Sequence, residues 1–154
     1  MVTNREIDRK RLLIPGLARV YEPLAPFAYA FMRFATGAIL LPHGINKLFV
    51  ADIDRAAAGI AAHGLPFPLL LAWLAVITES FAAGLLAVGL LTRIAAAMIW
   101  IEMLLITFLW QWPNGFLWTN KGYEFPLLWL LLVTAIFFRG GGRYSLDRLL
   151  GKEI

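Results

Sequence analysis

The chain has 154 residues, of which 60% are hydrophobic and 16% are charged, and its formal net charge is +4. A soluble domain is typically about half apolar and about a quarter charged, so this composition favours an integral membrane protein with a single domain. The absence of cysteine excludes structural disulfides, thiol catalysis and thiolate-ligated clusters. The two histidines, His43 and His63, are expected on different elements, which argues against a bis-histidine haem.

Residues 1–25 form a basic, amphipathic segment ahead of the first apolar run. Its cations are followed by prolines rather than by an uninterrupted apolar stretch with a small-residue cleavage site, so we do not predict a cleavable signal peptide. Two interpretations stay open. The segment either rests on the membrane surface with its cations toward anionic headgroups, or it is a solvated tail.

Four apolar stretches follow, and they predict an all-α fold, a four-helix transmembrane bundle. About 20 apolar residues are needed to cross roughly 30 Å of hydrocarbon. The expected spans are about 27–49, 69–91, 94–112 and 123–138, within one domain over residues 26–139, and a polar tail follows over residues 140–154. In the first span, Gly37 and Gly44 would allow a neighbouring helix to approach closely.

The connections between these spans carry helix-capping signals. Asp52 or Asp54 can cap a short helix over residues 55–63, which ends at His63, a predicted surface residue. In the turn GLLTR, Gly89 is suited to end one helix and Thr92 to cap the next. The second and third spans are therefore expected to form a tight hairpin.

Lysine and arginine counts near the span ends predict the orientation. Ten of these residues lie on the side of the two termini and three on the opposite side, which places both termini on the cytoplasmic side of a bacterial inner membrane. Aromatic residues suited to the interface belt cluster on the opposite side: Trp73, Trp110, Trp112, Trp118 and Tyr123.

Three ionisable residues lie deep within the predicted spans, away from the span ends. A charge at mid-bilayer costs about 2.5–3.5 kcal/mol, so Arg33, Glu79 and Glu102 are expected to face the bundle interior. At about 1.5 Å rise per residue, Arg33 and Glu102 lie at a similar depth, which predicts a structural ion pair between them. Glu79 lies further from the cytoplasmic side, and we interpret it as a catalytic, proton-handling group.

A second polar layer is expected at the outer mouth of the bundle. His43 joins Glu79 as a candidate catalytic residue, because histidine is the side chain suited to proton transfer near neutral pH, and it shares a helix face with Lys47 at i, i+4. The candidate ligand-binding residues are Asn46, Lys47, Tyr123 and Glu124, with Lys47 and Glu124 as a closing ion pair. The alternative is structural, because buried ion pairs can simply fix which helices meet. No Glu-x-x-His pair marks a di-metal site, so no metal is predicted.

Two motifs then point to a family. R-x3-G-x5-HG-x2-K over residues 33–47 and E-x4-GLL-x2-GLLTR over residues 79–93 resemble the DoxX family of small four-helix membrane proteins. The pattern is completed by PNGF at 113–116, GYE at 122–124 and GRYSLD at 142–147. The resemblance runs from about residue 30 to about residue 150, and it departs from the family in the long basic amino-terminal segment.

The resemblance implies a redox-linked membrane protein, since some relatives are described as membrane subunits of quinone-linked oxidoreductases, notably in thiosulfate oxidation, and others as assembly partners. The first hypothesis is a subunit that binds a quinone or another apolar ligand at the polar mouth. The second is a scaffold or assembly factor without catalysis. The third, a small transporter, would require oligomerisation. No self-contained active site is evident, and the expected partners are the bilayer, a protein partner or a second copy, but no nucleic acid.

Overall fold

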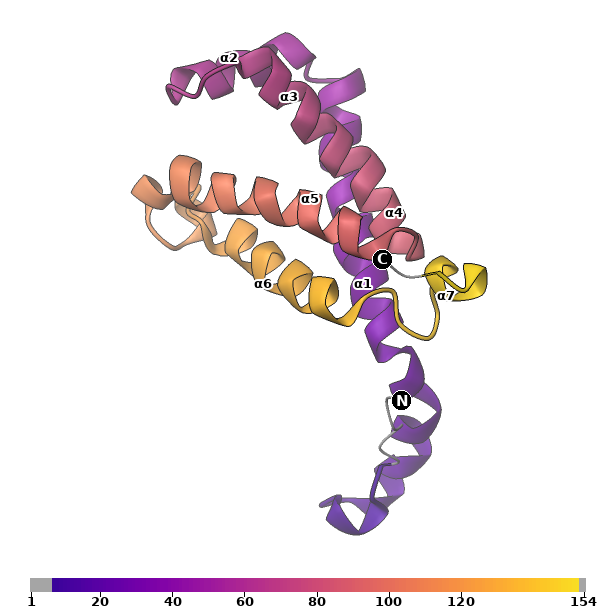
Figure 1. Cartoon of the computed structure of the whole chain (residues 1–154). Helices are drawn as coiled ribbons and strands as arrows, with labels where there is room; N and C mark the ends of the chain where they lie inside the picture. Colours follow the sequence, from indigo (N-terminus) through magenta and orange to yellow (C-terminus); the bar gives the residue numbers. More distant parts are fainter. Residues whose placement is uncertain (1–6, 153–154) are drawn as a thin grey trace.

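The structure is a computed structural model that describes residues 7–152, and these residues are helical without any strand (Figure 1). The long helix α1 covers Ala18–Phe49 and is preceded by two short 3-10 turns, Arg9–Arg11 and Pro15–Leu17. The remaining helices are α2 (Ile53–Ala62), α3 (Pro68–Ile77), α4 (Ala83–Val88), α5 (Thr92–Leu105), α6 (Glu124–Arg139) and α7 (Leu146–Leu150). Two π-helical segments, Thr78–Ala82 and Ile106–Gln111, continue α3 into α4 and extend α5.

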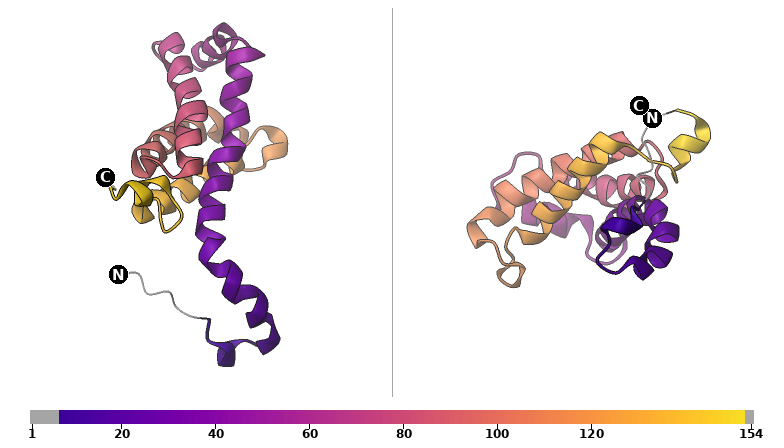
Figure 2. Two further views of the ribbon diagram at one scale, coloured as in Figure 1. Left: turned by 90° about the vertical axis from the view of Figure 1, so that its right-hand side faces the viewer. Right: turned by 90° about the horizontal axis from the view of Figure 1, so that it is seen from below.

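The helices form two groups that cross. One group consists of α1 with α3 and α4, which run alongside its carboxy-terminal half, and α2 covers the end of α3 (Figures 1 and 2). The other group is the antiparallel pair α5 and α6, which crosses α1 at a steep angle. The amino-terminal part of α1 extends beyond both groups (Figure 1).

Three helical stretches are long and apolar enough to cross a membrane: Pro15–Phe49, Pro68–Val88 and Thr92–Asn114. The all-helical membrane fold predicted from the sequence is therefore confirmed for the described residues. Helix α6 occupies the predicted fourth span, but its 16 residues extend only about 24 Å. A fourth crossing and the cytoplasmic location of both termini stay predictions.

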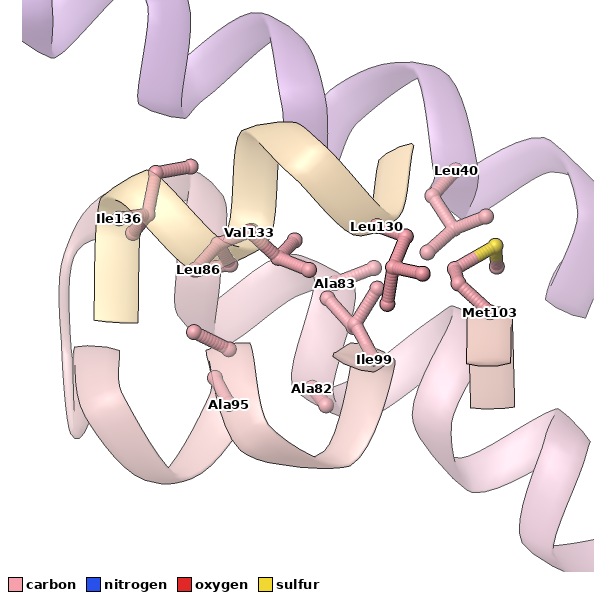
Figure 3. Packing of buried hydrophobic residues seen from close by; sticks show 11 residues of the cluster. Leu40, Ala82, Ala83, Leu86, Ala95, Ile99, Met103, Leu130, Val133 and Ile136 are labelled. Atoms are coloured by element: carbon pink, nitrogen blue, oxygen red, sulfur yellow. The ribbon is translucent and has the colours of Figure 1, made fainter. Parts of the chain in front are cut away.

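The apolar core lies where the two groups cross (Figure 3). Leu40 of α1 and Leu86 of α4 lie toward opposite sides of this cluster, and Ile99 of α5 and Val133 of α6 lie between them (Figure 3). Alanines separate these larger side chains and bring the backbones together: Ala82, Ala83, Ala95 and Ala96. In a lipid bilayer there is no hydrophobic driving force between helices, so their association depends on van der Waals packing. Small residues favour that packing because they let the backbones approach closely.

Two glycines of α1 make the closest helix contacts. A Cβ added at Gly37 would lie 2.4 Å from the carbonyl oxygen of Ala83, and one at Gly44 would lie 2.2 Å from Oγ of Ser80. Both contacts are far too short for a side chain, so the predicted role of these glycines in close helix approach is confirmed. Through Gly44, α1 lies directly against the π-helical segment that carries Glu79.

The capping signals are partly confirmed. Asp52 caps α2 by accepting a hydrogen bond from the N–H of Asp54, and Gly89 ends α4 with a φ of +74°. His63 is exposed, as predicted, and its ring stacks on Trp110 with centroids 4.1 Å apart. That contact joins the end of α2 to the second π-helical segment, so α2 packs against α3 and also contacts the segment that extends α5.

Candidate functional site

The first polar cluster surrounds Arg33, which is buried in α1. Its Nη1 donates hydrogen bonds to the carbonyl oxygens of Leu86 at 2.7 Å and Ala87 at 2.9 Å, and its Nη2 donates to the carbonyl oxygen of Tyr144 at 2.7 Å. The last carbonyls of a helix have no partner within the helix and carry partial negative charge, which suits a cation. Arg33 therefore ties the end of α4 and the carboxy-terminal tail to α1.

The predicted ion pair between Arg33 and Glu102 is wrong. Equal depth predicted that pair, but α5 crosses α1 at a steep angle, so residues at the same height on the two helices do not meet (Figure 1). The guanidinium of Arg33 instead serves the carbonyls described above. The carboxyl of Glu102 instead interacts electrostatically with Glu79 and Lys47, which are described below.

Asp147 in the tail completes the cluster around Arg33. Its Oδ1 accepts a hydrogen bond from the N–H of Leu91 at 2.6 Å, and its Oδ2 accepts from the N–H and hydroxyl of Thr92 at 3.0 and 2.6 Å. The tail carboxylate thus caps α5, and the prediction that Thr92 provides the cap is wrong, because Thr92 is already the first residue of the helix. Sequence reasoning missed Asp147, although the motif GRYSLD contains it.

Asp147 makes the stability of the protein depend on pH. Burial alone would raise its pKa, but hydrogen bonds from Thr92 and Leu91 and the charge of Arg33 together hold that pKa below its ordinary value of 3.8. A carboxyl with a lowered folded-state pKa stabilises the fold above its unfolded-state pKa and loses that contribution as the pH falls through the folded value.

We therefore expect stability to fall below about pH 4, and Asp147→Asn to flatten that part of the pH profile. At neutral pH the substitution should cost about 1–2 kcal/mol, the usual effect of losing a helix cap. Thermal unfolding in detergent across acidic pH measures both. An acid limb of equal slope in the wild type and in Asp147→Asn would contradict this assignment.

The second polar cluster consists of Lys47, Glu79 and Glu102. Lys47 forms an ion pair with Glu79, whose side chain is almost completely buried. Both carboxyl oxygens of Glu102 are buried and have no hydrogen-bond partner among the residues that the structure describes. The predicted closing pair of Lys47 and Glu124 is wrong, because Glu124 accepts a hydrogen bond from the N–H of Trp118 at 3.1 Å and orders its own loop.

Lys47 also faces an open hollow on the side of α1. Pro42, His43, Asn46 and Lys47 line this hollow, whose volume is about 370 Å³. His43, Asn46 and Lys47 therefore share one accessible face of α1, and their role in binding stays a prediction. Tyr123 does not line the hollow, since it stacks on Trp112 with centroids 4.5 Å apart, next to Glu124.

Glu79 belongs to a segment whose backbone departs from the α-helix, the π-helical segment Thr78–Ala82. Its π-helical segment leaves the buried hydroxyl of Ser80 without a hydrogen-bond partner among the described residues, and the second π-helical segment does the same for Thr107. Single π-helical turns often occur at functional sites. No periodicity or propensity in the sequence indicated these two turns.

The fold and its buried charges define an integral membrane protein that is embedded in a lipid bilayer. The sequence matches the DoxX family over residues 28–112, and the chain belongs to that family. It is 28% identical over 149 residues to a protein of Mycobacterium tuberculosis described as an uncharacterized membrane protein, with 90% of this chain and 91% of the relative covered. It is 32% identical over 135 residues to an uncharacterized protein of Haemophilus influenzae, with 86% and 97% covered. No solved structure matches the chain.

Proposed function

We propose that this chain is a bacterial inner-membrane subunit of a quinone-linked redox complex. In this proposal the head group of a quinone, or of a similar apolar ligand, binds in the hollow beside α1 and exchanges protons with the buried carboxyls behind it. Glu79 and His43 would move protons, while Lys47 and Asn46 would donate hydrogen bonds to the ligand. Tyr123 and Glu124 contact Trp112 and Trp118 of the loop before α6, and this proposal gives them no role in ligand binding.

One observation carries the proposal: Lys47 belongs to both sites at once. It lines the open hollow together with His43, and it forms the ion pair with buried Glu79. A group that binds in the hollow is therefore separated from the buried carboxylates by a single side chain. An ion pair with a purely architectural role has no need of an accessible face.

The chemistry of a quinone fits this arrangement. Reduction of a quinone to a quinol consumes two electrons and two protons, and the ring oxygens accept hydrogen bonds throughout. Lys47 and Asn46 supply donors to those oxygens, and Glu79 and His43 supply groups that give up protons. The two electrons would come from a redox-active partner or cofactor, because the protein supplies position and protons in such a reaction.

The test is quinone binding to the purified protein after Lys47→Gln. Losing a charge-assisted hydrogen bond costs about 1.5–3 kcal/mol, so the affinity should fall by roughly 10- to 100-fold. Lys121→Gln is the matched control, because it makes the same change on an exposed loop residue and should leave the affinity unchanged. Equal affinity in Lys47→Gln and the wild type would overturn the assignment of the hollow.

Histidine offers a second matched comparison. His43→Ala should lower quinone-dependent turnover and alter its pH profile, whereas His63→Ala, which alters a stacking contact far from the hollow in sequence, should not. Wild-type turnover in His43→Ala would remove His43 from the mechanism.

A second candidate function is a scaffold or assembly factor, and one feature favours it. The amino-terminal part of α1 extends beyond the rest of the molecule (Figure 1) and exposes large apolar side chains, among them Leu24 at 60% and Phe31 at 71% exposure. If this part binds a partner protein, the double variant Leu24→Ala with Phe31→Ala should remove that partner from a gentle purification. A full set of co-purifying proteins with this variant would count against the scaffold.

A further inference from the structure

The second polar cluster contains unequal numbers of positive and negative groups. Lys47 provides one cation, while Glu79 and Glu102 provide two carboxyls. The buried cation Arg33 donates its Nη1 and Nη2 hydrogen bonds to backbone carbonyls in the first cluster. Because an unpaired charge inside the membrane is costly, the excess negative charge must be removed by some other means.

Among the described residues, the charged groups that act on Glu102 are Glu79 and Lys47. The other ionisable residue of α5, Arg93, lies at the opposite end of that helix and donates a hydrogen bond to the carbonyl oxygen of Phe137. Besides Lys47, α1 brings His43, which is exposed on the hollow. Helix α3 contains no ionisable residue, and α6 has ionisable residues only at its ends, Glu124 and Arg139. The charge of Glu102 therefore has to be balanced within the cluster itself.

We propose that Glu79 and Glu102 hold a single proton between them, so that the cluster is neutral and serves as the proton store of the hollow. This inference rests on the proposed function only for the identity of the group that receives the proton. The packing of α5 against the π-helical segment and the burial of both side chains place the two carboxyls in the same part of the interior, and each carboxyl acts electrostatically on the other.

The lack of hydrogen-bond donors supports a shared proton. With both carboxyls ionised, the two buried oxygens of Glu102 have no partner among the described residues, which is costly for a charged group away from water. A proton on one carboxyl turns it into a donor to the other, so that each carboxyl gains one hydrogen-bond partner. Two carboxyls that share one proton in this way are an established arrangement in proteins.

A shared proton also gives Lys47 a defined role. While the proton is present, Lys47 balances the remaining negative charge through its ion pair with Glu79. When the proton leaves toward the hollow, the cluster becomes negative by one charge and draws a proton back. The store can therefore deliver one proton at a time, and a reaction that consumes two must refill it or take the second elsewhere.

Infrared spectroscopy of the purified, ligand-free protein tests this inference directly. A protonated carboxyl gives a C=O band that is separate from the bands of ionised carboxylates and shifts in D2O. We expect one such carboxyl per wild-type molecule at neutral pH. We expect none in either Glu79→Gln or Glu102→Gln, because Lys47 alone balances the single carboxylate that remains.

Lys47→Met gives the opposite expectation. With no cation in the cluster, both carboxyls should be protonated, and the band should double. Glu22→Gln, which changes an exposed carboxylate bound to Arg9, and Glu124→Gln should leave the band as in the wild type.

Two results would overturn the inference. One is the absence of a protonated carboxyl in the wild type. The other is a band that persists in Glu79→Gln, which would show that Glu102 holds the proton alone. Because no quinone is present in these measurements, a shared proton without quinone binding would contradict the proposed function but leave the proton store intact.

Discussion

Replacing Arg33 with methionine should lower the free energy of unfolding by about 3–5 kcal/mol, the usual cost of removing one partner of a buried charged interaction. The substitution keeps a long side chain but removes the hydrogen bonds to the carbonyls of Leu86, Ala87 and Tyr144. It also removes the positive charge that interacts with Asp147. The end of α4 and the tail would both lose their attachment to α1.

Unfolding of the purified protein in mixed micelles measures this effect. Arg19→Met is the matched control, because Arg19 lies on the same helix but is exposed, and its stability should stay within about 0.5 kcal/mol of the wild type. Arg33→Lys keeps the charge but not the planar guanidinium group, so its free energy of unfolding should lie between those of Arg33→Met and Arg19→Met. Wild-type stability in Arg33→Met would refute the view that this residue joins three segments.

Alanine at Gly37 or Gly44 should destabilise the protein by about 1–3 kcal/mol at each position, the usual cost of overpacking a close contact. The added Cβ meets backbone atoms that cannot rotate away: Ala83 O at 2.4 Å for Gly37, and Ser80 N at 2.8 Å for Gly44. Helix α1 would have to move away from α4 or from the π-helical segment. At Gly44 that movement should also weaken the contact between Lys47 and Glu79, one turn further along.

Gly84→Ala provides a control with the opposite sign. A Cβ at Gly84 would lie 3.8 Å from the Leu41 side chain, an ordinary contact, and Gly84 lies within α4. Alanine there should stabilise the helix by about 0.5–1 kcal/mol. The same unfolding assay ranks the three variants, and a loss in Gly84→Ala as large as that in Gly37→Ala would show that helix approach is not what the glycines provide.

Local signals in the sequence predicted most of the helices and their ends. The cap of α2 at Asp52, the end of α4 at Gly89 and the close approach at Gly37 each depend on one residue and its immediate neighbours. The hollow was also predictable in part, because His43 and Lys47 lie four residues apart on one helix. In these cases no information about the angle between helices was needed.

The partners of the buried charges, in contrast, can be predicted only if the crossing angle between the helices is known. Depth along each helix is readable from a sequence, but the crossing angle and the rotation of each helix about its axis are not. For this reason depth alone pairs Glu102 with Arg33, although Glu102 lies with Glu79 and Lys47, and local signals place the cap of α5 at Thr92, although it comes from Asp147, 55 residues away. The two π-helical segments shift the faces of α3 and α5 further, since each adds a wide turn to the helix.

The attachment of Arg33 to Tyr144 joins residues 111 positions apart and has a consequence for biosynthesis. The first helix enters the membrane long before the ribosome has made the tail, so one of the acceptors of Arg33 and the cap of α5 are missing throughout that period. Until then, this arginine has to be hydrated at the membrane edge or held by the insertion machinery. The protein can reach its final packing only after Tyr144 and Asp147 have left the ribosome, which makes a late stage of synthesis the step that joins these segments.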